Sequence, residues 1–218
     1  MLLASVSHDL RTPLTAIRAL AQDITIDGSR ARSHAEIIVT QVDRLGKLVA
    51  DVLDLSRLKA GGFSMNPELN TAEDLLGATV RQFSGVPEAH RIETVIDYSQ
   101  PALVGNFDFV QSLRVMTNLV DNALRCSRAD PVTISVAQTN GSLSFQVADR
   151  GPGIPAAERD RIFDAFYRPA DANVDGGAAG LGLSIARQLA EAQGGSVSYA
   201  DREGGGSIFT FELPAAKL

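Results

Sequence analysis

The first sixty residues carry an apolar pattern that strongly limits how they can fold. From Leu10 onward, apolar residues step alternately by four and three positions, and this spacing is typical of the packing seam of a helix in a bundle. The turn residues at 27–29 interrupt the pattern, which then resumes. We therefore expect two helices, over 2–26 and 32–59, joined as a hairpin. The seam positions are Leu10, Leu14, Ile17, Ala21 and Ile24 in the first helix and Ile38, Val42, Leu45, Val49 and Val52 in the second.

Two such helices have too little core to stand alone. Leu48, Leu53 and Leu55 also widen the apolar stripe of the second helix beyond a two-stranded seam. A wide stripe favours pairing with a second copy of the hairpin, which gives a four-helix bundle and therefore a homodimer. The alternative is that the hairpin packs on the rest of its own chain.

The seam also places a histidine on the outside of the first helix. His8 lies two residues before Leu10, so it faces outward, and Thr12 lies one turn later on the same face. Asp9 follows the histidine directly. A histidine held outward on a rigid helix, beside an acid and a hydroxyl, can react with a group that docks from outside. Taken alone, an outward histidine would more often be an ordinary surface residue.

The hydrophobic period changes after the glycines at 61–62. Helical and alternating segments follow, and the strands are mostly antiparallel and segregated from the helices, which indicates an α/β sandwich within an α+β chain. We expect a hairpin domain over 1–60, a linker over 61–66 and a second domain over 67–218. The expected helices are 73–83, 107–125 and 180–193, and the expected strands are 92–96, 132–137, 143–148, 197–200 and 208–213.

Composition narrows the functional classes. The chain has 26 acidic and 20 basic residues, a net charge of −6, and no basic stripe, which argues against a nucleic-acid partner. Its one cysteine, Cys126, excludes an internal disulfide and fits a reducing, cytoplasmic compartment. No apolar run is long enough to span a bilayer. We expect a fragment whose sensor segments lie upstream and anchor the full-length protein in the inner membrane.

Two motifs in the second domain suggest a nucleotide site. Asn118 and Asn122 share one helix face, and a carboxamide oxygen is a hard ligand that suits Mg²⁺ on a polyphosphate. Asp149 ends a strand and is followed by Gly151 and Gly153, which let the backbone approach a flat ligand. An acid at a strand end can accept a hydrogen bond from an exocyclic amine. Taken singly, the two asparagines also fit a solvated helix face, and the motif that begins at Asp149 also fits a common Gly-Pro turn.

Two further motifs flank the segment 169–179, which is rich in Ala, Asp and Gly and is expected to be a mobile loop. An aromatic cluster at 163–167 precedes it and anchors it, and Arg168 could reach a phosphate. Gly180, Leu181 and Gly182 follow it and open a helix, whose N-terminal N–H groups favour anions. The glycines match neither a Walker loop nor a dinucleotide fingerprint.

The octet SHDLRTPL at 7–14 resembles the H-box of sensor histidine kinases. The four later motifs resemble, in order, the N, G1, F and G2 boxes of the histidine-kinase ATPase domain, a fold shared with gyrase, Hsp90 and MutL. The resemblance covers essentially the whole chain. It implies a dimeric helical hairpin followed by an α/β sandwich ATPase domain that uses ATP and Mg²⁺. The stretch 60–63 and the first helix are also similar to the Kdp-type potassium sensor kinases.

The resemblance also implies residue roles. His8 would accept the phosphoryl group, Asp9 would orient the imidazole or take its proton, and Thr12 would position a water for dephosphorylation. Asn122 would bind Mg²⁺, Asp149 would bind the adenine amine, and 165–179 would form a lid. The implied nucleotide-binding set is Asn118, Asn122, Arg125, Asp149, Gly151, Gly153, Arg168, Gly180, Leu181 and Gly182.

The implied function is ATP-dependent autophosphorylation on His8, followed by transfer to an aspartate of a response-regulator receiver domain, with a regulator phosphatase activity beside it. The alternatives are a core that works mainly as a phosphatase and a nucleotide-binding scaffold that does not phosphorylate itself. Three positions depart from the family pattern and bear on nucleotide affinity and lid mobility. Arg125 and Cys126 stand where lysine and tyrosine are usual, and Ala178 stands where a glycine is usual.

Overall fold

The computed structural model describes residues 2–26, 30–59, 64–96, 103–127, 129–168 and 180–216. For residues 2–8, 26 and 59 it describes the backbone alone. The predicted turn at 27–29, residues 61–63 of the linker, Ala178 and most of the lid (169–179) fall outside the described residues.

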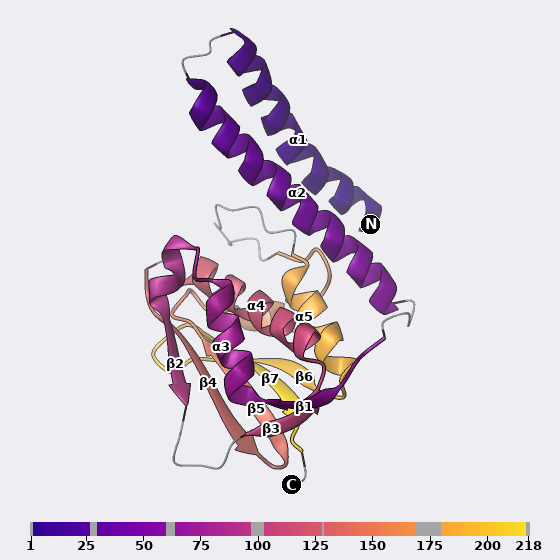
Figure 1. Cartoon of the computed structure of the whole chain (residues 1–218), viewed down its shortest axis with the longest axis vertical. Coiled ribbons are helices and arrows are strands. Elements are labelled where there is room, and N and C mark those ends of the chain that lie inside the picture. Colours follow the sequence, from indigo (N-terminus) through magenta and orange to yellow (C-terminus); the bar gives the residue numbers. More distant parts are fainter. Residues whose placement is uncertain are drawn as a thin grey trace.

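The N-terminal region is the predicted hairpin. Helix α1 (Leu2–Ile26) packs along helix α2 (Ala31–Lys59), and Leu48 and Leu55 of α2 are buried (Figure 1). Much of the predicted seam is nevertheless open to solvent within one chain. The large apolar side chains of the hairpin that remain exposed are Leu14, Ile37, Val39, Val42, Val49 and Leu53.

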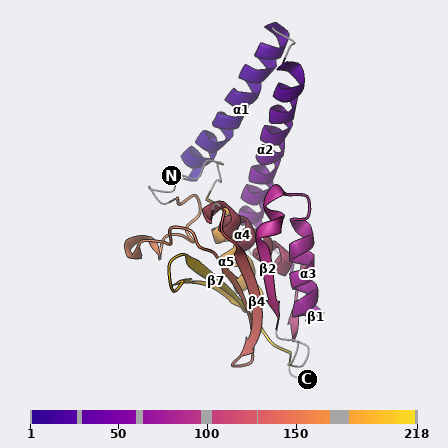
Figure 2. The same cartoon turned by 90° about the vertical axis from the view of Figure 1, so that its left-hand side faces the viewer.

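The C-terminal region is the predicted sandwich. Its five-stranded sheet has the order β2-β4-β5-β7-β6, in which β2 and β4 are parallel and the other pairs antiparallel. Helices α3 (Ala72–Gln82), α4 (Phe109–Cys126) and α5 (Gly182–Glu191) pack against this sheet (Figure 2). The strands are β2 (Ile92–Ile96), β4 (Val132–Thr139), β5 (Ser142–Ala148), β6 (Ser196–Asp201) and β7 (Ser207–Pro214).

A small second sheet was not predicted. Strand β1 (Glu68–Thr71) pairs antiparallel with β3 (Val104–Phe107). Both strands are four residues long, and the sequence of β1, ELNT, has no alternation of apolar and polar side chains that would indicate a strand. Short 3-10 turns at Pro87–Arg91 (η2) and Ala156–Glu158 (η3) complete the described structure.

The core lies between the helices and the sheet. Along α4, buried Val115, Leu119 and Ala123 follow helical spacing and face the sheet, and Phe145 of β5 stacks on Phe211 of β7 at 5.7 Å between ring centroids. Asp108 begins α4, because its carboxylate accepts the backbone N–H of Gln111 at 3.0 Å. This packing fixes α4 beside the ends of β5 and α5.

The hairpin contacts the second domain through α2. Arg114 of α4 pairs with Asp51 at 3.0 Å and with Asp54 at 2.5 Å, and Lys47 pairs with Asp121 at 3.1 Å. Helix α2 also packs on α5. No helix among the described residues is long and apolar enough to cross a membrane.

Candidate active site

Helix α4 brings its two asparagines to the start of α5. Asn118 is 9% exposed, and its Nδ2 has no hydrogen-bond partner among the described residues. A Cβ added to Gly182 would lie 3.5 Å from Asn118 Oδ1, so the first residue of α5 rests against this amide. Asn122 follows one turn later and is half-buried. The structure thus brings together two motifs that are sixty residues apart in the sequence.

Asp149 stands at the end of β5 with no exposed surface. Its N–H donates to the Ser207 carbonyl at 2.9 Å, and its Oδ1 accepts the Gly151 N–H at 2.7 Å. Its buried Oδ2 has no partner in the described part of the chain. Burial raises the pKa of Asp149, and the hydrogen bond from the Gly151 N–H is the largest effect that opposes this rise. A buried oxygen without a donor costs free energy, so it is well suited to accept a hydrogen bond from a ligand amine.

The loop after Asp149 touches the end of α4. A Cβ on Gly151 would lie 2.9 Å from Asp149 Oδ1 and 2.9 Å from the Cys126 carbonyl, so only glycine fits there. Gly153 has a φ of +72°, which also favours glycine. Burial, and then the charge of Asp149, raises the pKa of Cys126 to about 11. Its thiol therefore stays protonated and is a poor nucleophile at neutral pH.

The two ends of the segment 169–179 are held together. The Phe166 N–H donates to the Gly180 carbonyl at 2.9 Å, and a Cβ on Gly180 would lie 2.6 Å from the Tyr167 carbonyl. Arg168 is exposed directly before the segment. Leu181 is 1% exposed, so its side chain belongs to the core and only its backbone could face a ligand.

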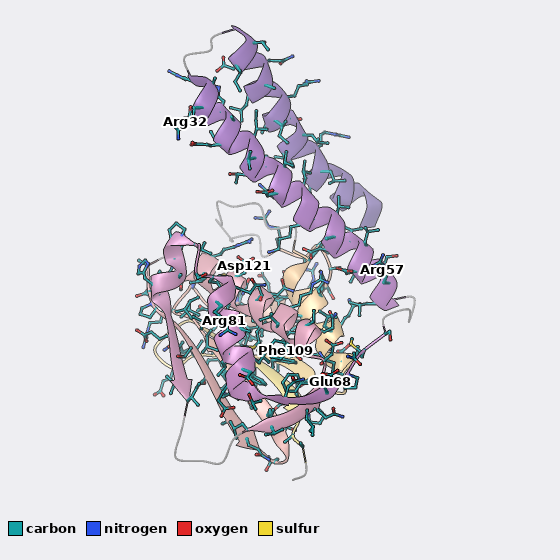
Figure 3. The ribbon with its side chains drawn as sticks, in the orientation of Figure 1. Arg32, Arg57, Glu68, Arg81, Phe109 and Asp121 are labelled. Atoms are coloured by element: carbon teal, nitrogen blue, oxygen red, sulfur yellow. The ribbon has the colours of Figure 1, made fainter. Side chains whose placement is uncertain are left out.

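Arg125 lies one turn beyond Asp121 and is already paired with it, at 2.6 Å. Asp121 also forms an ion pair with Lys47 of α2. In Figure 3 Asp121 lies on the side of the second domain that faces the hairpin. The predicted nucleotide-binding arginine is therefore linked to the hairpin through one carboxylate.

The predicted reactive residues lie near the start of α1. His8 lies in the helix, but its side chain is outside the described side chains; Asp9 is half-buried and Thr12 is exposed. In both views the N-terminal end of α1 is directed toward the second domain, and the end that leads into α2 is directed away (Figures 1 and 2).

Several residues of this region were not predicted from the sequence. Ser207 accepts the N–H of Asp149, and Gly206, at a φ of +108°, packs so closely that any Cβ would overlap the Asp149 carbonyl. The run of three glycines before β7 is the sequence signal that could have indicated this contact. Tyr199 of β6 accepts the N–H of Ile154 at 3.1 Å, and no pattern in the sequence around it indicates this contact.

The described side chains of this region could supply only some of the ligands of a metal ion. No cluster of three His, Cys, Asp or Glu side chains in the described part of the chain could hold a metal ion. A Mg²⁺ ion here would therefore depend on phosphate oxygens and water in addition to the Asn122 carboxamide, which is how this ion is commonly held beside polyphosphates.

Two family models match the chain. Residues 1–61 match the His Kinase A (phospho-acceptor) domain, and residues 108–217 match the histidine kinase-, DNA gyrase B-, and HSP90-like ATPase. Sensor protein KdpD of Mycobacterium tuberculosis (strain ATCC 25618 / H37Rv) is 34% identical over 225 residues, which cover 98% of this chain and 26% of KdpD. The chain therefore spans about a quarter of that relative's length.

Solved structures of histidine kinases are also similar to this chain. The histidine kinase AdeS of Acinetobacter baumannii superimposes with a TM-score of 0.76 at 25% identity, over 96% of this chain and 98% of that one. Full-length ShkA in complex with AMPPNP superimposes with a TM-score of 0.71 at 30% identity, over 99% of this chain and 46% of that one.

Proposed function

This chain belongs to the sensor histidine kinases of two-component systems and carries their catalytic core, and we propose that it phosphorylates itself from ATP on His8. The phosphoryl group then passes to an aspartate of a response regulator. The observation that supports nucleotide binding is the buried carboxylate of Asp149, whose Oδ2 has no donor among the described residues. It lies beside Gly151, a position where only glycine fits.

The geometry of the cluster supports the proposed binding roles. Asp149 Oδ2 accepts the adenine amine, and Gly151 and Gly153 let the base lie against the backbone. Asn118 and Asn122, with the first N–H groups of α5 at Gly182, hold the polyphosphate end. Mg²⁺ on Asn122 would supply charge neutralisation for the transferred group. Gly180, Arg168 and the backbone of Leu181 border the lid.

Phosphoryl transfer depends mainly on positioning, so the helix that holds His8 matters as much as the imidazole. A neutral ring nitrogen attacks the γ-phosphorus, a P–N bond forms, and the P–O bond to ADP breaks. Asp9, the next residue in α1, orients the ring or takes the released proton. An ordinary histidine is largely neutral at pH 7 and needs no special activation.

Arg125 replaces the lysine that is usual at this box position. We propose that its planar guanidinium still serves the phosphates, after it exchanges its ion pair with Asp121 for one with the nucleotide.

We also propose the wider assembly. The apolar side chains that stay exposed on α1 and α2, Leu14 and Val42 among them, support a homodimer through the hairpin. The division into 1–60, 61–66 and 67–218 fits the end of α2 at Lys59 and the start of β1 at Glu68. A Kdp-type role, a cytoplasmic location and an inner-membrane anchor elsewhere in a longer protein are proposals from the KdpD relatives.

Thr12 is proposed to serve a regulator phosphatase activity. It is exposed on α1, one turn from His8, where its hydroxyl can orient a water toward an aspartyl phosphate. Thr12→Ala should keep autophosphorylation and lose most phosphatase activity. A parallel fall of both rates, measured on one preparation with circular dichroism as a folding control, would leave Thr12 as helix structure only.

The rival function is a nucleotide-binding scaffold without kinase activity. Incubation of the chain with Mg²⁺ and γ-labelled ATP separates the two. The kinase predicts label that is labile in acid and stable in base, and that moves to an added receiver domain. Tight ATP binding without any such label would favour the scaffold.

A further inference from the structure

The residue after Gly153 is held by side chains at both of its backbone polar groups. The N–H of Ile154 donates to Tyr199 Oη at 3.1 Å, and its carbonyl accepts from Arg159 Nε at 3.2 Å. Ile154 lies outside any helix or strand, so these two bonds replace the ladder bonds that a regular element would supply.

The side chains that hold Ile154 also bind one another. The Tyr199 hydroxyl donates to Asp201 Oδ1 at 2.8 Å. The guanidinium of Arg159 donates to both carboxylate oxygens of Asp201, at 2.8 and 2.6 Å, and its carbon lies 5.6 Å from the centre of the Tyr199 ring. Tyr199 and Asp201 are two apart on β6 and so share a face. We call Arg159, Tyr199 and Asp201 the Ile154 clasp.

Tyr199 can donate and accept a hydrogen bond at the same time within the Ile154 clasp. Partial burial and then the hydrogen bond to Asp201 raise the pKa of Tyr199, so the phenol keeps its proton. The hydroxyl can therefore donate to Asp201 while it accepts from Ile154. Its ring packs edge-on against Phe209 of β7, with ring centroids 5.5 Å apart, which ties the clasp to the central sheet.

The clasp lies against the glycine loop itself. A Cβ on Gly153 would lie 3.9 Å from Tyr199 Oη and 3.4 Å from the Gly206 carbonyl. The other end of the loop is fixed by the hydrogen bond from Asp149 to Ser207. The loop is thus held at its start by the sheet and at its end by Tyr199 and Arg159, which Asp201 joins.

We propose that the Ile154 clasp positions the loop 149–154 for the nucleotide base, and that Tyr199 is a positioning residue for base affinity and selectivity. This inference rests on the proposed function. Arg159 and Asp201 are 40% and 56% exposed, so the ion pair is weakened by salt, while the hydroxyl bond to Ile154 is not. The hydroxyl is therefore the part of the clasp to remove first.

Tyr199→Phe keeps the ring against Phe209 and removes the hydroxyl alone. Loss of one hydrogen bond to a loop amide should raise the Kd and KM for Mg-ATP about threefold to tenfold. The kcat for autophosphorylation should stay unchanged, because the clasp does not touch the transferred group. The preference for ATP over GTP should fall as the loop loses its position. In the unliganded protein, hydrogen exchange of the Ile154 amide should become faster.

Two matched variants separate positioning from general damage. Ser196→Ala removes another hydroxyl from β6, one that donates to Glu212 at 3.1 Å, and it should leave the ATP Kd at the wild-type value. Asp201→Ala should weaken binding like Tyr199→Phe, and the double variant should be no weaker than the more affected single one, because both act through Ile154.

The outcomes distinguish the two proposals. A wild-type chain that binds no adenine nucleotide would overturn the proposed function and the positioning role with it. A wild-type chain that binds ATP, together with a Tyr199→Phe variant of unchanged Kd, base preference and Ile154 exchange, would overturn the clasp alone. A fall in kcat at unchanged KM would equally contradict positioning of the base.

Discussion

Asp149 shows the conflict between stability and function at a single residue. Its carboxylate is fully buried, it receives a hydrogen bond from Gly151 on one oxygen, and its other oxygen has no donor among the described residues. A buried charge of this kind costs free energy in the unliganded protein. In our account the cost is offset when the adenine amine binds.

Asp149→Asn should therefore separate binding from folding. The amide is uncharged, so at pH 7 the unliganded variant should melt no lower than the wild type, while its affinity for ATP should fall. The two readouts are thermal denaturation and calorimetric titration with Mg-ATP. Wild-type affinity in the folded variant would remove Asp149 from base recognition, and a large loss of thermal stability would make its role structural.

The same residue predicts the sign of a pH dependence. The pKa of Asp149 is raised in the folded protein, so the folded state binds a proton more readily than the unfolded state. Its contribution to stability is fully present below the unfolded pKa and is lost as the pH rises through the folded pKa. The stability advantage of Asp149→Asn should thus be largest at neutral pH and shrink on acidification. An advantage that grows in acid would contradict the assignment.

The residues around Asp149 differ in how far the sequence could predict them. Asp149, Gly151 and Gly153 could be predicted because they are adjacent in one short motif. Tyr199 could not, because it reaches the loop from 45 positions away, through a strand pairing that the sequence does not specify.

Helix α4 carries the two asparagines of the proposed nucleotide site, and both of its ends are fixed by specific side chains. Asp108 caps the start and donates its own N–H to Gln193 at 2.9 Å. At the other end, the buried guanidinium of Arg91 donates to the carbonyls of Leu124, at 3.3 Å, and Asp130, at 2.9 Å, and to the Ser127 hydroxyl. Arg91 therefore satisfies one of the last carbonyls of the helix, that of Leu124, and ties it to the turn that follows.

Arg91→Met keeps much of the side-chain volume and removes every donor. It should lower the free energy of unfolding by about 1–3 kcal/mol, the cost of leaving buried carbonyls unsatisfied. Urea denaturation of the variant measures this change. The control is Arg81→Met on the exposed side of α3, which should change stability by less than about 0.5 kcal/mol. Equal midpoints for the two variants would show that Arg91 does not hold α4.

Elements were predictable where their pattern was long. Within the described residues, the five α-helices and the five strands of the main sheet were predicted to within a few residues, and most of them carry several periods of apolar spacing. Strands β1 and β3 are too short and polar for this, and they exist because each completes the other's hydrogen bonds.

The whole molecule depends on how the hairpin docks on the ATPase domain. Arg114 of α4 lies between Asp51 and Asp54 of α2, and all three side chains are largely shielded from solvent. Burial raises the pKa of Asp51, and the adjacent Arg114 opposes the rise. No sequence pattern indicated this pairing, because its partners are some sixty positions apart and each alone reads as a charge on a helix surface.

Arg114→Ala should loosen this docking. It leaves two partly buried carboxylates close together without the cation that pairs with both, and the domains should separate to give a larger radius of gyration in solution scattering. Arg114→Lys should be intermediate, since one ammonium cannot bridge both acids as a guanidinium does. Arg32→Ala, which breaks an exposed pair with Glu36 near the far end of the hairpin, is the control and should change nothing (Figure 3). Identical scattering for Arg114→Ala and Arg32→Ala would show that these ion pairs do not hold the domains together.

His8 is proposed to take the γ-phosphoryl group of ATP, and one labelling comparison tests this assignment. His90 is exposed and bound only locally, to the Pro87 carbonyl at 2.7 Å, so His90→Gln is a mild control. Both variants and the wild type are incubated with γ-labelled ATP and Mg²⁺, and acid-labile, base-stable label is counted. Wild-type label is expected on His90→Gln and none on His8→Gln. Label retained by His8→Gln, with loss from His90→Gln, would contradict this assignment.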